Sequence, residues 1–360
     1  MPSENSTITL FEKEDILSSK LLLGISISII ILFTILGNFL VFLVVVMNKK
    51  LQTRTNCFIV SLAVADFCVG MLVMPPALVL ELTEGYWPWS QNVCSVWIAL
   101  DIMNSTASIL NLCVVGVDRL FAITSPFSYD TKRSAVRTTC MITGVWICSA
   151  LLSFVPVFLG WNSPGDYKIP LAHQCTFTLS LAYAVTSSCV SFYVPLLVML
   201  CTYVSIFRAA QRQSRQVSDL DASNFRNGVN IVNVNSADDF SQAYRRKLTV
   251  ILARERKAFK SLGIIMGVFV ICWLPFFICN VTDPLCHGCV PPMVFSIFTW
   301  LGWVNSIFNP IIYAYLNRDF RRAAKMLLTG RRCRRHVTDH DMATDLETYA
   351  LSKAATAKQQ

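Results

Sequence analysis

The chain has 360 residues, of which 54% are hydrophobic and 15% charged, and its mean hydropathy is +0.51. Soluble domains carry about a quarter of charged residues, so this composition excludes an ordinary soluble protein and predicts an integral membrane protein. The net charge of +9 does not indicate a nucleic-acid-binding protein, because the basic residues are concentrated in the loops on one side of the apolar stretches.

Seven apolar stretches are each long enough to cross a bilayer as a helix. In chain order they cover residues 21–47, 57–80, 93–123, 136–160, 179–207, 258–281 and 291–315. The residue alternation of a membrane β-barrel is absent. We therefore expect an all-α membrane protein whose seven-helix bundle occupies residues 21–316.

The charges between the spans predict how the chain is oriented in the membrane. Lysine and arginine are frequent in alternate loops and after the last span, whereas the opposite loops carry mainly acidic residues. By the positive-inside rule, residues 1–20 form an extracellular tail, and a flexible loop at about 213–248 and a tail at 330–360 are cytoplasmic. The N-terminal segment has no recognisable cleavable signal sequence. Asn5, in an Asn-Ser-Thr tripeptide, is a glycosylation acceptor on the outer side.

Four of the fourteen cysteines fall in segments expected outside the cell, where disulfides form. Cys94 and Cys175 are placed so that a disulfide would tie the third span to the second outer loop. Cys286 and Cys289 share the third outer loop; free thiols or half a metal site are the alternatives, but only four histidines are present, which favours a small disulfide. Cys333 lies among arginines after the last span, a pattern typical of palmitoylation.

The third apolar stretch has ionisable residues near both ends. Asp101 and Asp118 are separated by about 26 Å along a helix, which is most of the roughly 30 Å apolar thickness of a bilayer. A charged side chain inside a span is costly and indicates function by default. We therefore predict a cation site at Asp101 and a switch at Asp118 and Arg119.

Asp66 is a lone acid in the second span and needs polar partners at the same depth. Ser108 in the third span and Asn305 and Asn309 in the seventh are placed to supply oxygen ligands. One carboxylate among neutral oxygens suits a hard monovalent cation such as sodium, the only cofactor that the sequence suggests. A hydrogen-bonded structural aspartate is the alternative.

Prolines interrupt three of the spans. Pro195, Pro275 and Pro310 each remove a backbone donor and bend their helix, which indicates a bundle built to move. After the seventh span, residues 317–329 place apolar side chains among basic ones at helical spacing. This pattern predicts an amphipathic helix that lies on the inner lipid surface.

These motifs together resemble the rhodopsin-like (class A) G-protein-coupled receptors over the whole chain. The matching positions are Asn38, Asp66, Cys94, Asp118, Arg119, Trp146, Pro195, 272–275 (Cys-Trp-Leu-Pro) and 309–313 (Asn-Pro-Ile-Ile-Tyr). The resemblance implies a plasma-membrane receptor rather than an enzyme. It also implies a heterotrimeric G protein, receptor kinases and arrestin as partners.

Within that family, the candidate pocket resembles that of the biogenic-amine receptors. Asp101 matches the aspartate that holds a protonated amine through a charge-assisted hydrogen bond. Ser187, Ser188 and Ser191 of the fifth span match contacts to two catechol hydroxyls, although serines in spans also bond to their own backbone. The resemblance assigns the remaining ligand contacts to Ile102, Ser105, Trp273, Phe276, Phe277, Asn280 and Trp303, with the Trp303 ring facing the amine.

The finer resemblance is to the cyclase-stimulating, D1-like dopamine receptors. It rests on the stretches 101–119, 183–195, 259–280 and 300–306. It implies dopamine as the agonist, a stimulatory G protein and adenylyl cyclase. Noradrenaline or octopamine, then serotonin or histamine, are the alternative agonists, because shorter segments resemble their receptors. A membrane transporter is the alternative from another class, and the lack of an internal repeat argues against it.

The resemblance also implies how the inner end of the bundle works. Arg119 would pair with Asp118 and with Glu255 at the foot of the sixth span, and Phe127 would dock on the G protein. When the Arg119–Glu255 pair opens, the side chains of Tyr203 and Tyr313 would occupy the space that it leaves. Two further positions depart from the family pattern: Leu120 stands where a tyrosine is usual, which bears on basal activity, and Asn104 is polar beside the sodium site.

Overall fold

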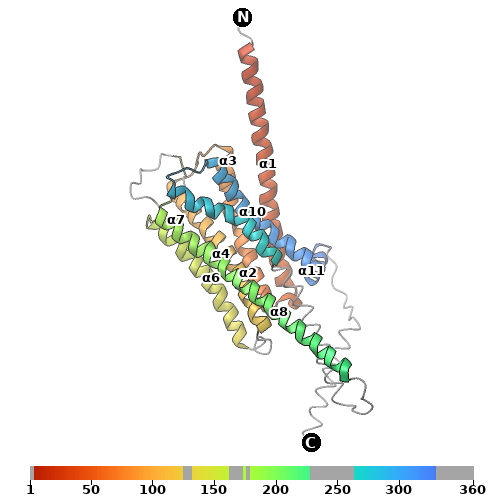
Figure 1. Cartoon of the computed structure of the whole chain (residues 1–360). Helices are drawn as coiled ribbons and strands as arrows, with labels where there is room; N and C mark the ends of the chain where they lie inside the picture. Colours follow the sequence, from red (N-terminus) through yellow and green to blue (C-terminus); the bar gives the residue numbers. More distant parts are fainter. Residues whose placement is uncertain (1–3, 125–131, 162–172, 176–178, 228–262, 330–360) are drawn as a thin grey trace.

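The computed structural model describes residues 4–124, 132–161, 173–175, 179–227 and 263–329 (Figure 1). Among them the only strand-like pairing is one isolated bridge between Tyr86 and Gln174, so the predicted all-α class is confirmed. The predicted sites at Phe127, Glu255 and Cys333 lie outside the described residues, as do residues 228–248 of the predicted loop and the tail at 330–360. Asn5 lies in a described helix, but its side chain is outside the described part.

The bundle consists of long helices, two of which are interrupted by a π turn. The elements are α1 (Glu4–Met47), η1 (Lys49–Leu51), α2 (Arg54–Cys68), η2 (Val69–Val73), α3 (Met74–Leu82), α4 (Gln91–Thr124), α6 (Lys132–Phe158), α7 (Leu181–Ser188), η3 (Cys189–Tyr193), α8 (Val194–Asn227), the helix Gly263–Leu285, α10 (Pro292–Leu316) and α11 (Arg318–Leu328). The second span is α2, η2 and α3 in succession, and the fifth is α7, η3 and α8.

Six helices among the described residues are both long enough and apolar enough to cross a membrane. They are Leu17–Met47, Arg54–Leu82, Gln91–Phe121, Ala135–Phe158, Leu181–Ala209 and Gly263–Leu285. The seventh predicted span is α10, which has 25 residues and is not among these six; Asn305, Ser306 and Asn309 lie on it. Two helices exceed their predicted spans: α1 begins at Glu4, and α8 continues to Asn227.

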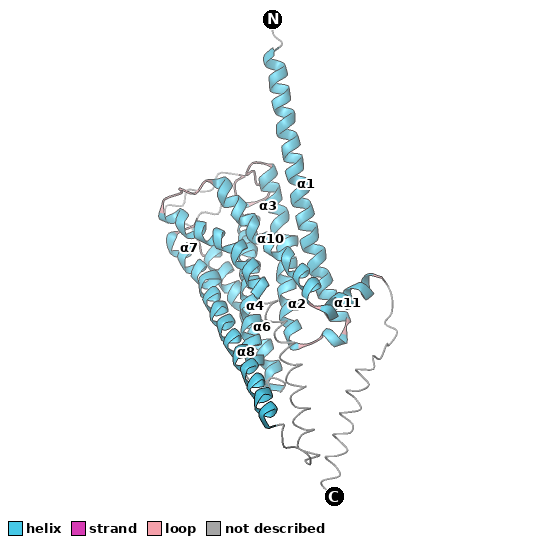
Figure 2. Ribbon diagram, turned by 45° about the vertical axis from the view of Figure 1, so that its right-hand side comes forward, coloured by secondary structure: helices cyan, strands magenta, loops and turns pink. Residues whose placement is uncertain are grey.

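The helices lie side by side in one elongated bundle, beyond which α1 extends (Figures 1 and 2). The third span, α4, packs against α2, α6 and α8, so it occupies the centre. Its Ile109 is fully buried, as are Phe58 of the second span, Phe192 of the fifth and Phe269 of the sixth. This central position explains how one helix can present both Asp101 and Asp118 to its neighbours.

Both π turns stand directly before prolines. The Val194 N–H donates to the carbonyl of Cys189, five residues back, and Pro195 follows. The Met74 N–H donates in the same way to Val69. A proline cannot donate to the carbonyl four residues before it, so a locally wider turn relieves both the missing bond and the ring clash.

A side-chain cap begins α11, and two disulfides tie loops of the chain. Asn317 ends α10 and caps α11 by accepting from the N–H groups of Asp319 and Phe320, both at 3.1 Å. The predicted amphipathic helix is therefore confirmed as α11, with Phe320, Ala323 and Ala324 buried and Arg321 exposed. Both predicted disulfides are present, with Cα–Cα distances of 5.7 Å for Cys94–Cys175 and 5.5 Å for Cys286–Cys289.

Candidate functional site

A cavity of about 150 Å³ lies between α4, the fifth span, the helix Gly263–Leu285 and α10. Ten of the eleven predicted ligand contacts line it: Asp101, Ile102, Ser105, Ser187, Ser191, Trp273, Phe276, Phe277, Asn280 and Trp303. The lining that the sequence did not predict as ligand contact is Trp97, Ile98, Thr106, Ile109, Leu179, Tyr183, Phe295 and Thr299. The third, fifth, sixth and seventh spans thus meet where the sequence predicted one pocket.

Asp101 is held in the cavity by two neutral donors. The indole Nε1 of Trp303 donates to its Oδ1 at 2.8 Å, and the Ser105 hydroxyl donates to the same atom at 3.2 Å. Ser105 can reach Asp101 because residues four apart on a helix lie on the same face. No basic side chain is among the described partners of Asp101, so a cationic ligand is what would offset its buried charge. Trp303, predicted as a cation–π partner of the amine, donates a hydrogen bond to the acid that would hold that amine.

The serines of the fifth span do not share one environment. Ser187 and Ser191 line the cavity, and the Ser191 hydroxyl is 3.1 Å from that of Thr106 on α4. Ser188 is fully buried behind them and accepts from the Asn280 Nδ2 at 2.9 Å. Two serines are therefore available to a ligand, whereas Ser188 positions Asn280.

Aromatic rings form the wall between Asp101 and the serines. The Trp273 and Phe277 ring centroids are 5.8 Å apart, and Phe276 meets Phe277 edge-to-face at 5.2 Å. Phe192 stacks on Phe277 at 4.5 Å, which links the wall to the core. Gly302 is required opposite Trp273, because a Cβ there would lie 2.8 Å from the indole ring. The wall is thus rigid and suited to an aryl ring.

A second acid, Glu81, connects to Asp101 through two indoles. Ser296 and Trp300 of α10 both donate to the Glu81 Oε1, the indole at 3.1 Å. The rings of Trp300 and Trp303 meet edge-to-face with centroids 4.9 Å apart, and Trp303 bonds to Asp101. The sequence analysis counted Glu81 only as an outer-loop charge. The signal that it missed is the four-residue spacing of Ser296 and Trp300 on one face of α10.

Asp66 is the centre of a buried polar cluster. Its Oδ1 accepts from Ser108 at 2.7 Å and from Ser306 at 2.9 Å, and its Oδ2 accepts from the Asn309 Nδ2 at 2.7 Å. Ser108 and Asn309 were predicted, whereas Ser306 was not. Asn305 is buried on the same helix, but the hydrogen bonds to Asp66 among the described residues of α10 come from Ser306 and Asn309.

The oxygen atoms around Asp66 fit a sodium ion. The carboxylate and two hydroxyls are hard oxygen ligands. Asn104 lies one turn before Ser108 on α4, and its Oδ1 is buried with no hydrogen-bond partner among the described residues. A buried acceptor without a donor is an unfavourable arrangement that a cation or water molecule would relieve. Asn104 therefore extends the set of candidate ligands.

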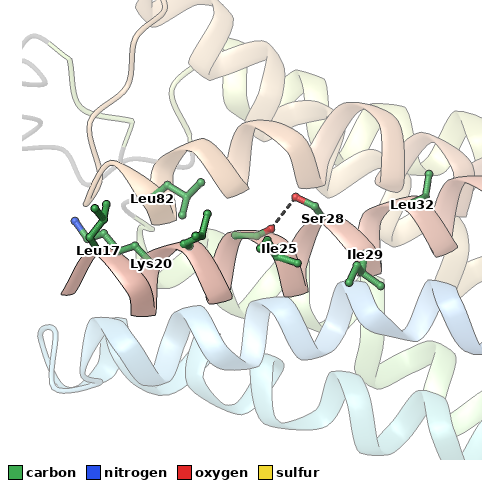
Figure 3. Close-up of a pocket in the computed structure, with 9 residues that line it drawn as sticks. Leu17, Lys20, Ile25, Ser28, Ile29, Leu32 and Leu82 are labelled. Carbon is green, nitrogen blue, oxygen red and sulfur yellow. Dashed lines mark hydrogen bonds between the residues drawn. The ribbon is translucent and has the colours of Figure 1, made fainter. Parts of the chain in front are cut away.

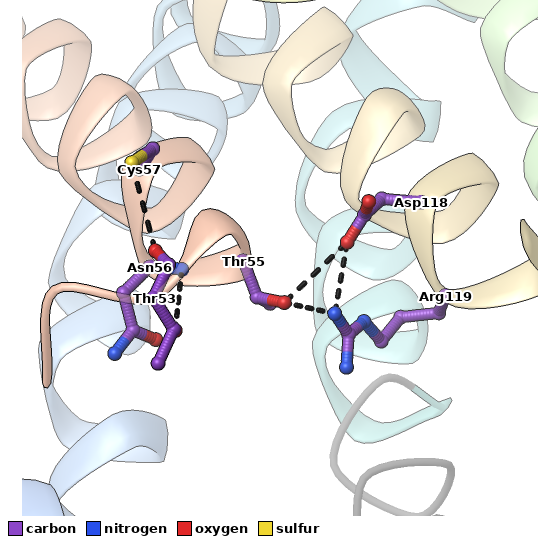
Figure 4. Close-up of polar contacts among 6 residues, drawn as sticks. All are labelled: Thr53, Thr55, Asn56, Cys57, Asp118 and Arg119. Atoms are coloured by element: carbon purple, nitrogen blue, oxygen red, sulfur yellow. Dashed lines mark hydrogen bonds and ion pairs between the residues drawn. The ribbon is translucent and has the colours of Figure 1, made fainter. Parts of the chain in front are cut away.

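The predicted inner switch is assembled at the start of α2 and the end of α4. Arg119 Nη2 lies 2.8 Å from Asp118 Oδ2, and Thr55 donates to that oxygen at 3.4 Å (Figure 4). Arg119 also donates to the Thr55 hydroxyl, so three side chains close one network. The sequence analysis did not identify Thr55, because its relation to Asp118 depends on how α2 packs on α4.

The two tyrosines predicted for the switch, Tyr203 and Tyr313, lie on the fifth span and on α10. A Cβ at Gly263 would lie 3.0 Å from the Tyr203 hydroxyl oxygen, so the fifth and sixth spans approach closely there. Tyr313 is buried on α10. The predicted partner of Arg119 on the sixth span, Glu255, is outside the described residues.

Comparison with known proteins identifies the family. The family model described as 7 transmembrane receptor (rhodopsin family) matches residues 37–313. A D(1) dopamine receptor of Carassius auratus is 42% identical over 327 residues, covering 86% of this chain and 89% of that receptor. A D(1A) dopamine receptor of Xenopus laevis is 42% identical over 351 residues, covering 91% and 76%.

A third relative extends the match almost to the whole chain. It is a D(1)-like dopamine receptor of Oreochromis mossambicus, 40% identical over 356 residues that cover 95% of this chain and 89% of that receptor. The family match runs from the Gly-Asn pair in the second half of the first span to Tyr313 of α10. The chain is thus a multi-pass membrane receptor, not an enzyme, and it belongs to the D1-like dopamine receptors of the rhodopsin family.

Proposed function

We propose that this receptor binds dopamine in the cavity between Asp101 and the serines of the fifth span. The observation that carries the proposal is the pairing, across one cavity, of a carboxylate lacking a described cationic partner with the hydroxyls of Ser187 and Ser191. Dopamine carries an ammonium at one end and two adjacent ring hydroxyls at the other. The names of the three relatives, all dopamine receptors, support the same ligand.

Each part of the ligand has a matching group. The ammonium would bond to the Asp101 carboxylate, whose charge strengthens the hydrogen bond and whose burial reduces screening. The ring would lie against Phe276 and Phe277, and the hydroxyls would face Ser187 and Ser191. Asn280 is held by Ser188, so its free carbonyl side can face the ring hydroxyls.

Binding would then favour an active arrangement of the bundle. A ligand shifts a conformational equilibrium only by its difference in affinity for the two states, so bonds from α4 to the fifth span must be stronger in the active one. Phe192 of that span contacts both Phe277 and Phe269, with the Phe269 centroid at 5.6 Å. A shift of η3 would therefore be transmitted to the sixth span.

At the inner end the proposed output is activation of a stimulatory G protein and adenylyl cyclase. Outward movement of the sixth span would release Arg119 from the proposed Glu255 pair, and Tyr203 and Tyr313 would occupy the space. Phe127 is the proposed G-protein anchor. Receptor kinases and arrestin are proposed as the partners that end signalling.

The remaining proposals concern the membrane setting. The basic inner loops support an extracellular N-terminus with a glycan at Asn5 and a palmitoyl group at Cys333. The buried apolar face and exposed arginines of α11 support its contact with membrane lipid.

For sodium, we propose that Asp66, Ser108, Ser306 and Asn104 hold the ion. When bound, the ion would supply a positive charge beside the Asp66 carboxylate.

The test is cyclic AMP in cells that express the receptor, dosed separately with dopamine, noradrenaline, octopamine, serotonin and histamine. We expect the response at lowest dose with dopamine, its loss in Asp101→Ala and a shift to higher dose in Ser187→Ala. Ser26→Ala, at an exposed position of α1, is the control for a serine that lies away from the cavity. Serotonin or histamine acting at the lowest dose would contradict the assignment of the serines.

A further inference from the structure

A groove lies on α1, away from the cavity already described. It is lined by Leu17, Lys20, Leu21, Gly24, Ile25, Ser28, Ile29 and Leu32 of α1 and by Leu82 of α3, with a volume of about 600 Å³ (Figure 3). These α1 residues recur every three or four positions, so they form one continuous face of the helix. The groove therefore runs along the helix axis.

Two features make this face a recess with apolar walls. At Gly24 a Cβ would lie 3.4 Å from a Leu82 methyl, so α1 and α3 approach closely there and a side chain larger than alanine would fill the recess between them. The Ser28 hydroxyl is turned onto the Gly24 carbonyl at 2.7 Å, which satisfies it inside the groove (Figure 3). Only the end at Lys20 presents charge.

The length of the groove matches one lipid leaflet. Lys20 and Leu32 are separated by about 18 Å at ~1.5 Å per helical residue. Half of the apolar thickness of a bilayer is about 15 Å. With the Lys20 ammonium at the level of the headgroups, Leu32 lies near the middle of the membrane. The groove is therefore about as long as one acyl chain of a lipid.

The charged end carries both signs. Lys20 Nζ bonds to the Glu84 Oε1 at 2.5 Å, and the two side chains remain 34% and 74% exposed. Glu84 has a φ of 53° and Gly85 a φ of 89°, so a left-handed turn brings this acid back over α1. The hydrogen bond and the charge of Lys20 lower the pKa of Glu84, which keeps it ionised.

We propose that the groove binds one zwitterionic phospholipid. Its phosphate would bond to Lys20, its ammonium would face Glu84, and one acyl chain would fill the recess from Leu17 to Leu32. An anionic lipid has a phosphate for Lys20 but no ammonium for the Glu84 carboxylate. A sterol has a hydroxyl but no charged group for either side chain. If the N-terminus is extracellular, the lipid belongs to the outer leaflet.

The test is native mass spectrometry of the full-length receptor, released from vesicles of equimolar palmitoyl-oleoyl phosphatidylcholine, palmitoyl-oleoyl phosphatidylglycerol and cholesterol. We expect one retained phosphatidylcholine per receptor. Its retention should fall about threefold in Lys20→Met and in Glu84→Gln, the effect of losing one exposed charge contact. Gly24→Leu, which fills the recess, should abolish it.

Matched controls separate the groove from general effects. Gly144→Leu adds the same side chain at an exposed glycine of α6 with no atom within 4 Å, and Lys50→Met removes an exposed charge elsewhere. Agonist binding by each variant verifies folding. Preferential retention of phosphatidylglycerol or cholesterol, or equal phosphatidylcholine retention by Gly24→Leu and Gly144→Leu, would overturn the proposal. So would a dimer that Gly24→Leu dissociates, because a second copy would then occupy the groove.

Discussion

At the residue scale, the buried carboxylate of Asp101 accepts hydrogen bonds from two neutral donors. Asp101→Asn keeps an oxygen acceptor for Trp303 and Ser105 but removes the charge that attracts an ammonium. Loss of one member of a buried charged pair costs about 2–5 kcal/mol, so we expect amine affinity to fall about 30-fold or more in competition binding. Ser105→Ala is the control: it loses one hydrogen bond and should cost about 1 kcal/mol. Equal affinities of Asp101→Asn and the unmodified receptor would contradict the role of the charge.

The separate positions of the serines lead to a second prediction. Ser187 lines the cavity, whereas Ser188 accepts from Asn280 behind it. Ser187→Ala should therefore reduce the preference for dopamine over tyramine, which has one ring hydroxyl, whereas Ser188→Ala should preserve that ratio. Ser188→Ala should instead lower thermal stability, since an unpaired buried amide costs about 1–3 kcal/mol. Affinity ratios and melting temperatures of the two variants provide the check.

At the element scale, the C-terminal end of the second span and the N-terminal half of the seventh are joined through Glu81. This acid fixes Trp300, which packs on Trp303, the donor to Asp101. Glu81→Leu should free Trp300 and weaken amine binding about three- to tenfold, which is less than the loss of a charged hydrogen bond because Glu81 acts on Asp101 only through the two indoles. Glu81→Gln retains an acceptor and should restore most of the affinity. If Gln and Leu behave alike, Glu81 does not position the indoles.

The cluster around Asp66 links three helices, α2, α4 and α10, and should make agonist binding sensitive to sodium. Replacing choline chloride by sodium chloride at constant ionic strength should lower agonist affinity, provided that the ion favours the inactive arrangement. Asp66→Asn removes the only charged ligand, so its agonist affinity should be the same in both salts. Asn104→Leu removes the buried orphan oxygen and should weaken the sodium effect without abolishing it. A sodium effect that survives in Asp66→Asn would place the ion elsewhere.

At the scale of the whole molecule, the sequence predicted the spans and most of the cavity. Long apolar runs suffice for the spans, because the bilayer leaves a helix few alternatives. The lining residues followed from resemblance, since cavity geometry cannot be read from hydropathy. Ser306, Thr55 and Glu81 were missed because each depends on how one helix is rotated against another. Hydropathy also gave no sign of the π turn at Cys189–Tyr193.

The inner network of Thr55, Asp118 and Arg119 should restrain the whole bundle in its inactive arrangement. Thr55→Ala removes one bond to each of the other two side chains. A loss of about 1 kcal/mol, if confined to the inactive state, raises the active population about fivefold. Cyclic AMP without agonist, normalised to surface receptor, should rise accordingly. Thr53→Ala, which removes the N-cap of α2 two residues before Thr55, controls for disturbance of α2 (Figure 4).

The π turn of the fifth span also has a consequence for gene evolution. Such a turn holds one residue more than a regular helix needs, and each helical residue corresponds to a rotation of about 100°. Loss of a single codon within Cys189–Tyr193 would therefore remove the extra residue and leave a helix of nearly the same length that is kinked at Pro195. Ser187 would rotate out of the cavity, while Tyr203, beyond the deletion, would keep its place. A one-codon deletion could thus alter what this receptor recognises and leave its signalling end intact.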